Sequence, residues 1–299
     1  MSTAHSLGRS KKRQTVFAAT LFLIPVFFFI VVYIIYPIID SFSLSLHSWN
    51  GIDSAKKFIG LDNWKVLAGD KVFFKAFFNN LLIVLLSILI QLPIGMALAF
   101  FLDTGGKKFN FLKVVLFLPM LMSSVATGFL FKYVYDPQFG LISAIVSWFK
   151  EQAMVDILGS EKLAIFAVIA VICWQFIPFY MVYFLAGLSA LPMEVYEAAI
   201  IDGATRGKYF WRVALPMLRG TVKSAMILSM VGALKYFDLI WVMTEGGPMG
   251  STELMATYMY KNAFQTMKMG YGATIASAMF IIITTISLVT LKAMNREEE

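Results

Sequence analysis

The sequence predicts an all-α polytopic membrane protein with six transmembrane helices. Of its 299 residues, 59% are hydrophobic and only 14% are charged, whereas about a quarter of the residues are charged in an ordinary soluble domain. Several nearly uncharged runs reach the roughly 20 residues that a helix needs to cross the hydrocarbon core. The single cysteine, Cys173, lies in one of these runs, so neither a disulfide framework nor a cysteine-based zinc site is expected.

Six runs are long enough to span a membrane. In chain order they cover residues 16–39, 76–102, 114–131, 163–191, 222–243 and 269–291. Basic residues precede the first run as in a signal peptide, but its 24 residues exceed the roughly 7–15 of a signal core, so we expect a retained helix. The apolar segment 139–149 is too short to cross and is expected to lie at the interface on one side.

The positions of Lys and Arg indicate which side holds the chain ends. With six spans both ends share a side, and placing them in the cytoplasm puts 14 of the 25 Lys and Arg inside, ten outside and Lys235 in the membrane. The inside segments then carry a net charge of +7 and the outside segments none. We therefore expect cytoplasmic tails at 1–15 and 292–299 and an external loop at 40–75. The overall positive charge indicates topology, not a nucleic-acid partner.

A polar stretch, YEAAIIDGATRGKYFWRVALP, interrupts the apolar chain at 196–216, within a predicted cytoplasmic loop at 192–221. Pro192 suits a helix start, Gly203 permits the turn that ends this helix, and Thr205 can cap a second short helix. The second helix would have a basic side, made of Arg206, Lys208 and Arg212. From these features alone two interpretations stay open: an amphipathic helix on lipid headgroups, or a helix that inserts into a protein groove.

The spacing in this loop resembles the signature loop of permease subunits of ABC importers, known as the EAA loop. The pattern is E-A-A, three residues, G, nine residues, an aliphatic residue, one residue and L-P. It is matched here by Glu197, Ala198, Ala199, Gly203, Val213, Leu215 and Pro216, with Val where the pattern often has Ile. Other stretches narrow the resemblance to carbohydrate-type uptake permeases, the group that includes the larger channel subunit of the maltose importer. These are YPIIDSFSLSL (36–46), FIGLDNW (58–64), DPQFGLIS (136–143), FDLIWVMTEGGP (237–248) and MGYGATIASAM (269–279).

The resemblance implies a type I ABC importer permease fold in a bacterial inner or plasma membrane, with residues 76–291 as the transmembrane domain of five helices. It implies a second, homologous permease, two ATPase subunits on the cytoplasmic loops, and an external binding protein that delivers a sugar or oligosaccharide. Glu197 would contact the rim of the ATPase groove, the two alanines would allow close insertion, and Gly203 would form the hinge. The expected coupling residues are Glu197, Ala198, Ala199, Asp202, Gly203, Leu215 and Pro216.

Energy is expected to come from the partners. The chain has no G-x-x-x-x-G-K-[ST] motif to hold phosphates, and its two histidines, His5 and His47, lie outside the spans. We therefore expect a transport subunit that is not an enzyme and binds no metal or cofactor, with ATP and Mg in the ATPase subunits. Two alternatives remain: the same architecture for another solute such as glycerol phosphate, and an ion-coupled secondary carrier.

Charged and polar residues inside the spans are candidates for the substrate path. Lys235 and Asp238 are the only charged residues deep in a span. Three apart on one predicted helix face, they could pair with each other, face a polar ligand, or contact the partner permease. The other candidates are Tyr236, Trp241, Asn80, Gln91 and Gln175, together with Asn79, Trp174, Ser123 and Ser124, although single polar residues in spans mostly serve packing. The external stretch 244–252 reads as a rigid turn that either contacts the binding protein or connects two spans.

Overall fold

The computed structural model describes residues 20, 22–148 and 156–295. These residues form two compact units, one made of residues up to 68 and 262–278, and the other of 69–261 and 279–295. The predicted tail at 1–15, the start of the first span and the acidic end at 297–299 lie outside the described residues.

The described chain contains four continuous helices that are long and apolar enough to cross a membrane, and two bent helix pairs that pass the same test. Counting each bent pair as one span gives the predicted six. The continuous helices are Phe22–Ser45, α4 (Lys71–Gly105), α8 (Ala164–Ser189) and Met269–Met294, the last lying in α15 (Met269–Asn295). The bent pairs are α5 (Asn110–Leu121) with α6 (Ser124–Val134), and Arg206–Met217 with α12 (Arg219–Leu234).

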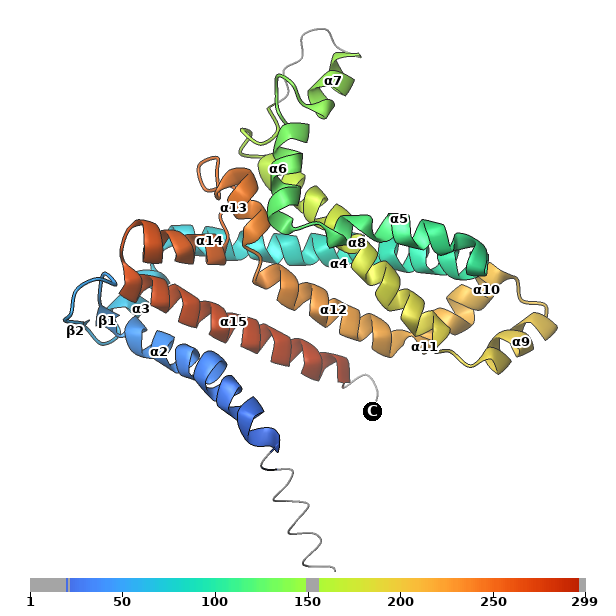
Figure 1. Cartoon of the computed structure of the whole chain (residues 1–299), viewed down its shortest axis with the longest axis horizontal. Helices are drawn as coiled ribbons and strands as arrows, with labels where there is room; N and C mark the ends of the chain where they lie inside the picture. Colours follow the sequence, from blue (N-terminus) through green and yellow to red (C-terminus); the bar gives the residue numbers. More distant parts are fainter. Residues whose placement is uncertain (1–19, 21, 149–155, 296–299) are drawn as a thin grey trace, which may run out of the picture. The chain divides into compact units, whose positions relative to one another are not determined.

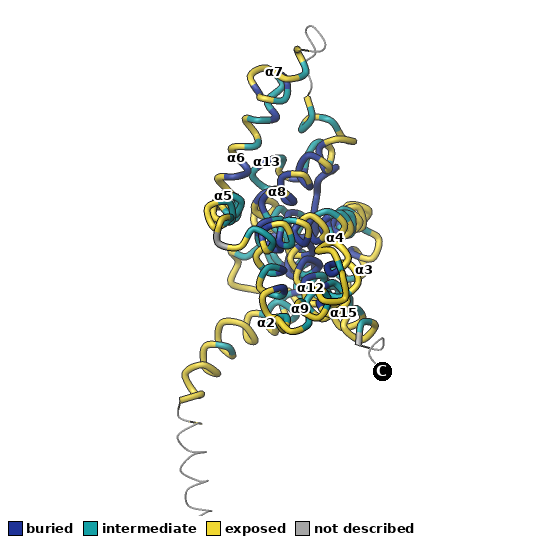
Figure 2. The backbone as a smooth tube through the Cα atoms, turned by 90° about the vertical axis from the view of Figure 1, so that its right-hand side faces the viewer, coloured by how far each residue is buried: buried dark blue, intermediate teal, exposed yellow. Residues whose placement is uncertain are grey.

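In the first unit, the helix Phe22–Ser45 includes a π-helical turn, η1 (Val31–Ile35), and ends as α2 (Tyr36–Ser45). Most of its residues are apolar and exposed, and the tube in Figure 2 shows this exposure along the helix. The region predicted as an external loop is partly ordered into short elements. These are an antiparallel pair, β1 (His47–Ser48) with β2 (Lys57–Phe58), and α3 (Asp62–Ala68).

In the second unit, α4 and α8 lie against each other along much of their length (Figure 1). Asp70 begins α4 by accepting hydrogen bonds from the backbone N–H groups of Val72 and Phe73, at 2.8 and 3.2 Å. Gly95 allows the close approach, because a Cβ there would lie 2.8 Å from the Cβ of Tyr180 on α8. The two helices therefore form the buried centre of this unit, on which α5 and α12 pack.

Two predicted spans are broken, contrary to their description as single helices. The span predicted at 114–131 bends by 92° between α5 and α6. The span predicted at 222–243 ends as α12 at Leu234 and resumes as α13 (Asp238–Thr244). Phe237, which precedes α13, has φ −143° and ψ −63°, which no helix can include. Composition alone could not reveal these breaks, because both halves of each span are apolar.

The remaining elements are short. The segment predicted to lie at the interface contains α7 (Leu141–Ser147), and its last residue, Phe149, lies outside the described part of the chain. The others are η2 (Gly106–Phe109), α9 (Met193–Ile201), α10 (Arg206–Tyr209), η3 (Phe210–Ala214), α11 (Leu215–Met217), α14 (Met255–Tyr260) and η4 (Lys261–Gln265). Helices α9 to α11 make up the predicted coupling loop.

Candidate functional site

The first helix of the loop, α9, has a defined start and a defined end. Pro192 is its N-cap residue, and Glu194 lies in its first turn, where a carboxylate interacts favourably with the helix dipole. At the other end the N–H of Gly203 bonds to Ile200 O at 3.0 Å, and the N–H of Ala204 bonds to Ala199 O at 2.9 Å. These are the two hydrogen bonds of a Schellman motif, and they require the φ of +75° that Gly203 adopts. The predicted hinge is therefore a fixed helix stop.

The face of α9 that carries the motif is open to solvent. Glu197, Ala198 and Asp202 are exposed, and Ala199 is half-buried. Sequence reasoning missed Ile201, whose surface is 85% exposed next to these residues. The missed signal was an aliphatic pair, Ile200 and Ile201, inside an otherwise polar loop. Small residues and exposed aliphatics beside carboxylates form a surface suited to a protein partner.

The second part of the loop turns the chain back toward the membrane. The Thr205 hydroxyl accepts a hydrogen bond from the N–H of Lys208 at 3.4 Å, as expected for a cap. Leu215 and Pro216 lie in α11, which follows η3 without a gap in the helix Arg206–Met217. Leu215 is half-buried against neighbouring apolar side chains, and the chain then bends by 69° into α12. Pro216 therefore lies just before the bend into α12.

Two contacts join this loop to the end of α4, and a third joins its first two helices to each other. The guanidinium of Arg206 donates to Thr104 O at 3.1 Å. The rings of Phe210 and Phe100 lie 4.4 Å apart between centroids. Tyr209 packs edge-on against Tyr196 of α9, with centroids 5.0 Å apart. The loop is thus attached to a transmembrane helix as well as to its own flanking spans.

A hollow of about 310 Å³ lies between these contacts. Its walls include Asp103 and Thr104 of α4, Tyr196 of α9, and Arg206 and Tyr209 of α10. Burial raises the pKa of the Tyr209 phenol, and the charges of Asp103 and Tyr196 raise it further. The phenol therefore stays neutral at physiological pH and can act as a hydrogen-bond donor.

The break between α12 and α13 separates the two intramembrane charges. Lys235 caps the end of α12, whereas Asp238 is the first residue of α13, so the prediction that they share one helix face is wrong. Both side chains are exposed, and among the described residues they form no ion pair with each other. Of the alternatives left open by the sequence, the mutual ion pair is therefore excluded in this structure.

Aromatic residues surround the same break. Tyr236 packs edge-on against Phe176, and its buried hydroxyl has no hydrogen-bond partner among the described residues. Trp241 stacks on Phe237, with ring centroids 5.5 Å apart, and packs on Tyr260 at 4.8 Å. Tyr236 also lines a cavity of about 190 Å³. This arrangement combines exposed charges, an available hydroxyl and aromatic faces.

Gln91 lines the cavity beside Tyr236, together with mostly apolar residues of α8 and α12. Its amide nitrogen lies 3.1 Å from the Ser87 hydroxyl and 3.8 Å from the Cys173 sulfur. The amide nitrogen of Gln91 is therefore oriented by Ser87 and Cys173, while the residue still borders the cavity. Gln91 is thus a polar candidate on α4 that borders a cavity.

Two other candidates, Asn80 and Gln175, hold the backbone at the two broken spans. The buried Asn80 amide donates to Ala233 O at 3.0 Å, and its oxygen accepts from the N–H of Met255 at 3.0 Å. The Gln175 amide donates to Met122 O at 3.1 Å, at the junction of α5 and α6. Backbone groups freed by a break must be satisfied within a membrane protein. These two residues therefore stabilise the breaks.

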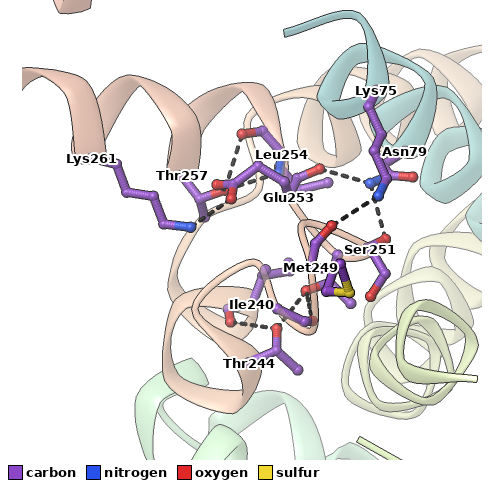
Figure 3. A network of polar contacts seen from close by, with 12 residues as sticks. Lys75, Asn79, Ile240, Thr244, Met249, Ser251, Glu253, Leu254, Thr257 and Lys261 are labelled. Carbon is purple, nitrogen blue, oxygen red and sulfur yellow. Dashed lines mark hydrogen bonds and ion pairs between the residues drawn. The ribbon is translucent and has the colours of Figure 1, made fainter. Parts of the chain in front are cut away.

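The predicted rigid turn at 244–252 is held by a polar network that sequence reasoning missed (Figure 3). The Asn79 amide donates to Ser251 O and Glu253 O at 3.0 and 2.9 Å. Glu253 is 4% exposed, accepts from the Thr257 hydroxyl at 2.7 Å and pairs with Lys261 at 2.5 Å. The spacing of 253, 257 and 261, four residues apart each time, was the available signal, although Glu253 itself lies just before α14. Within the described residues, no group of three or more His, Cys, Asp or Glu side chains could hold a metal ion.

Comparisons with known proteins agree with this geometry. A family model described as a binding-protein-dependent transport system inner membrane component matches residues 91–296. The chain is 32% identical to the multiple sugar-binding transport system permease protein of Streptococcus mutans, over 90% of this chain and 92% of that protein. It is 29% identical to the trehalose/maltose transport system permease protein of Thermococcus litoralis, over 91% of this chain and 92% of that protein.

A solved structure gives the same fold. It is the crystal structure of a bacterial ABC transporter involved in the import of the acidic polysaccharide alginate. The match has a TM-score of 0.81 at 22% identity and covers 97% of this chain and 99% of that chain. The predicted all-α fold of an importer permease is therefore confirmed.

Proposed function

The chain belongs to the family of binding-protein-dependent transport system inner membrane components, and from this membership we propose that it is one of two permease subunits of a carbohydrate ABC importer. Relatives named as sugar permeases align over at least 90% of this chain, which supports a sugar or oligosaccharide as the solute. An external binding protein would deliver this solute. The excess of Lys and Arg on the predicted inner segments supports cytoplasmic ends in a bacterial inner or plasma membrane.

The observation that supports this function most strongly is the geometry of α9. The E-A-A residues lie on a solvent-exposed helix that is fixed at both ends and joined to α4 through the following turn. We assign this helix to a groove on an ATPase subunit, with Ala198 and Ala199 allowing close approach. Glu197 and Asp202 would lie at the polar rim, and Ile201 would fill the apolar part of the groove. Closure of two ATPase subunits would then move the spans.

The substrate path is assigned to the break between α12 and α13. Lys235 and Asp238 offer exposed charges there, Tyr236 offers a buried hydroxyl, and Trp241 offers an aromatic face. Sugars are held by such combinations of hydrogen-bonding groups and rings. Gln91 borders the adjacent cavity, whereas Asn80 and Gln175 act as supports for the broken helices. The second permease would complete the path.

Purification of the chain with its partners tests this function. We expect an ATPase and a second permease to co-purify, and sugar uptake into vesicles to require ATP and the binding protein. Uptake driven by an ion gradient without an ATPase would instead identify a secondary carrier and would overturn the proposal. ATP-dependent uptake of glycerol phosphate, with no sugar transported, would keep the architecture and reject the carbohydrate assignment. The ligand held by the cognate binding protein names the solute directly.

A further inference from the structure

The two halves of the coupling loop carry opposite charges. Residues 190–205, which include α9, contain Glu194, Glu197 and Asp202 and no Lys or Arg. Residues 206–221 contain Arg206, Lys208, Arg212 and Arg219 and no Asp or Glu. A single partner surface would have to carry positive charge opposite α9 and negative charge opposite the basic half, only a few residues away. This segregation indicates that the two halves face different partners.

The basic half is amphipathic, and its apolar side is already occupied. Tyr209, Phe210, Ala214 and Leu218 are buried in the core of the second unit. The opposite side exposes three cations and an aromatic ring, namely Lys208, Arg212, Arg219 and Trp211. Trp211 is 68% exposed. We call these four residues the basic patch.

The cations of the basic patch have no partner within the described chain. Lys208, Arg212 and Arg219 make no side-chain hydrogen bond or ion pair with another described residue. Arg206, by contrast, points to Thr104, and Lys223 donates to Met294 O. The patch is therefore free to bind an anionic surface.

We propose that the basic patch binds the headgroups of anionic phospholipids in the inner leaflet. The patch ends at Arg219, just before the span predicted at 222–243, which puts it at the predicted membrane interface. Lys and Arg near an anionic leaflet are attracted to it, and Trp favours the headgroup level. The acidic α9 is repelled from the same surface and stays available for the ATPase. The patch thus fixes the height of the loop relative to the membrane, a role beyond the proposed transport function.

Lipid retention by the purified importer tests this proposal. The importer, with its partner subunits, is reconstituted in vesicles of phosphatidylcholine alone or in an equal mixture with phosphatidylglycerol, and lipids that remain bound after extraction are counted by mass spectrometry. We expect the K208Q/R212Q/R219Q variant to retain at least about tenfold less phosphatidylglycerol, because each cation near an anionic surface contributes about fivefold in affinity. The K208R/R212K/R219K variant should retain as much as the unmodified protein.

A matched control removes the same charge elsewhere. The K56Q/K57Q/K65Q variant changes three exposed lysines of another loop and should retain phosphatidylglycerol normally. Equal retention by the patch variant and the unmodified protein would overturn the proposal. Loss of the ATPase subunits at unchanged lipid retention would also overturn it and would identify a protein partner for the patch. If no vesicle shows uptake, the proposed transport function is rejected. The retention measurement still tests whether the basic patch binds anionic lipid, because it does not depend on uptake.

Discussion

Phe100 of α4 and Phe210 of η3 pack against each other at a tilt of 34°, with ring centroids 4.4 Å apart, where the coupling loop meets a transmembrane helix. The adjacent hydrogen bond from Arg206 to Thr104 O joins the same two segments. A displacement of α9 by an ATPase would therefore reach α4 directly, in addition to the two spans that flank the loop. Because α4 packs along α8, this contact gives the loop a connection to the buried centre of the second unit.

We predict that Phe210→Ala weakens the coupling between ATP hydrolysis and uptake. The substitution removes the ring contact, and coupling between distant sites is typically about 5- to 150-fold. The expected result is at least about a fivefold lower ratio of sugar transported to ATP hydrolysed. The measurement is uptake and hydrolysis in the same vesicles. Phe210→Leu, which keeps an apolar contact, should preserve most of the ratio; a ratio unchanged in the alanine variant would refute the role of this contact.

The end of α9 leads to a second prediction. Gly203 has a φ of +75°, and no atom would lie within 4 Å of an added Cβ. A substitution there is therefore limited by backbone conformation and not by space. Gly203→Val should disturb the helix stop and lower the ratio of uptake to hydrolysis by about fivefold or more. Gly203→Asn is the control, because asparagine tolerates the left-handed region, and it should transport at nearly the normal rate. Similar defects in both variants would show that any side chain at position 203 impairs transport, so backbone conformation would not be the limiting factor.

Local features of the fold could be predicted from the sequence, and features that depend on distant residues could not. Pro192, Gly203 and Thr205 were predicted at helix ends because capping depends on a few neighbouring residues. The breaks in the third and fifth spans were missed because the groups that stabilise them are remote. Gln175 lies 53 residues from Met122, and Asn80 lies 153 residues from Ala233.

The same distinction applies to the candidate site. The E-A-A spacing could be recognised in the sequence because the motif is contiguous, and the coupling role that it predicts for the loop stays a prediction. Polarity alone identified Asn80 and Gln175 as candidates for the substrate path, but it cannot separate a side chain that faces a ligand from one that bonds to backbone. Lys235 and Asp238 were expected on one face because a continuous helix was assumed. The helix break changed their relationship without any change in their spacing.

We predict that Asn80→Leu destabilises the protein. It leaves the N–H of Met255 without its partner and removes one of the donors to Ala233 O, and an unsatisfied buried backbone group costs about 1–3 kcal/mol. Thermal unfolding of the purified permease should therefore begin at a lower temperature, and its abundance in the membrane should fall together with uptake. The control is Asn110→Leu at the exposed start of α5, expected to change stability by less than about 0.5 kcal/mol. If the Asn80→Leu variant has normal stability but has lost uptake, Asn80 contacts the substrate and does not serve mainly to stabilise the break.

We predict the opposite pattern for Lys235 and Asp238. Because both side chains are exposed and unpaired with each other, Lys235→Ala and Asp238→Ala should leave abundance nearly normal. Uptake should fall by about tenfold or more, since a hydrogen bond to a charged group contributes about 1.5–3 kcal/mol. The exchange K235D/D238K tests the ion pair directly. Restored uptake in the exchanged protein would mean that the two residues pair during transport, and equal losses of uptake and abundance would indicate a structural role.

The last prediction concerns the ion pair of Glu253 and Lys261 beneath the external turn (Figure 3). The Glu253 side chain is nearly inaccessible, whereas that of Lys261 is partly exposed, so removing the lysine leaves a buried carboxylate supported mainly by the Thr257 hydroxyl. Lys261→Ala should lower the free energy of unfolding by about 3–5 kcal/mol, as observed when one partner of a buried pair is lost. The double variant E253Q/K261M should recover much of this loss, because it removes the buried charge together with its partner. Thermal unfolding of both variants is the measurement. A double variant less stable than Lys261→Ala would mean that the carboxylate itself, through Thr257 and the turn, stabilises this region more than the ion pair does.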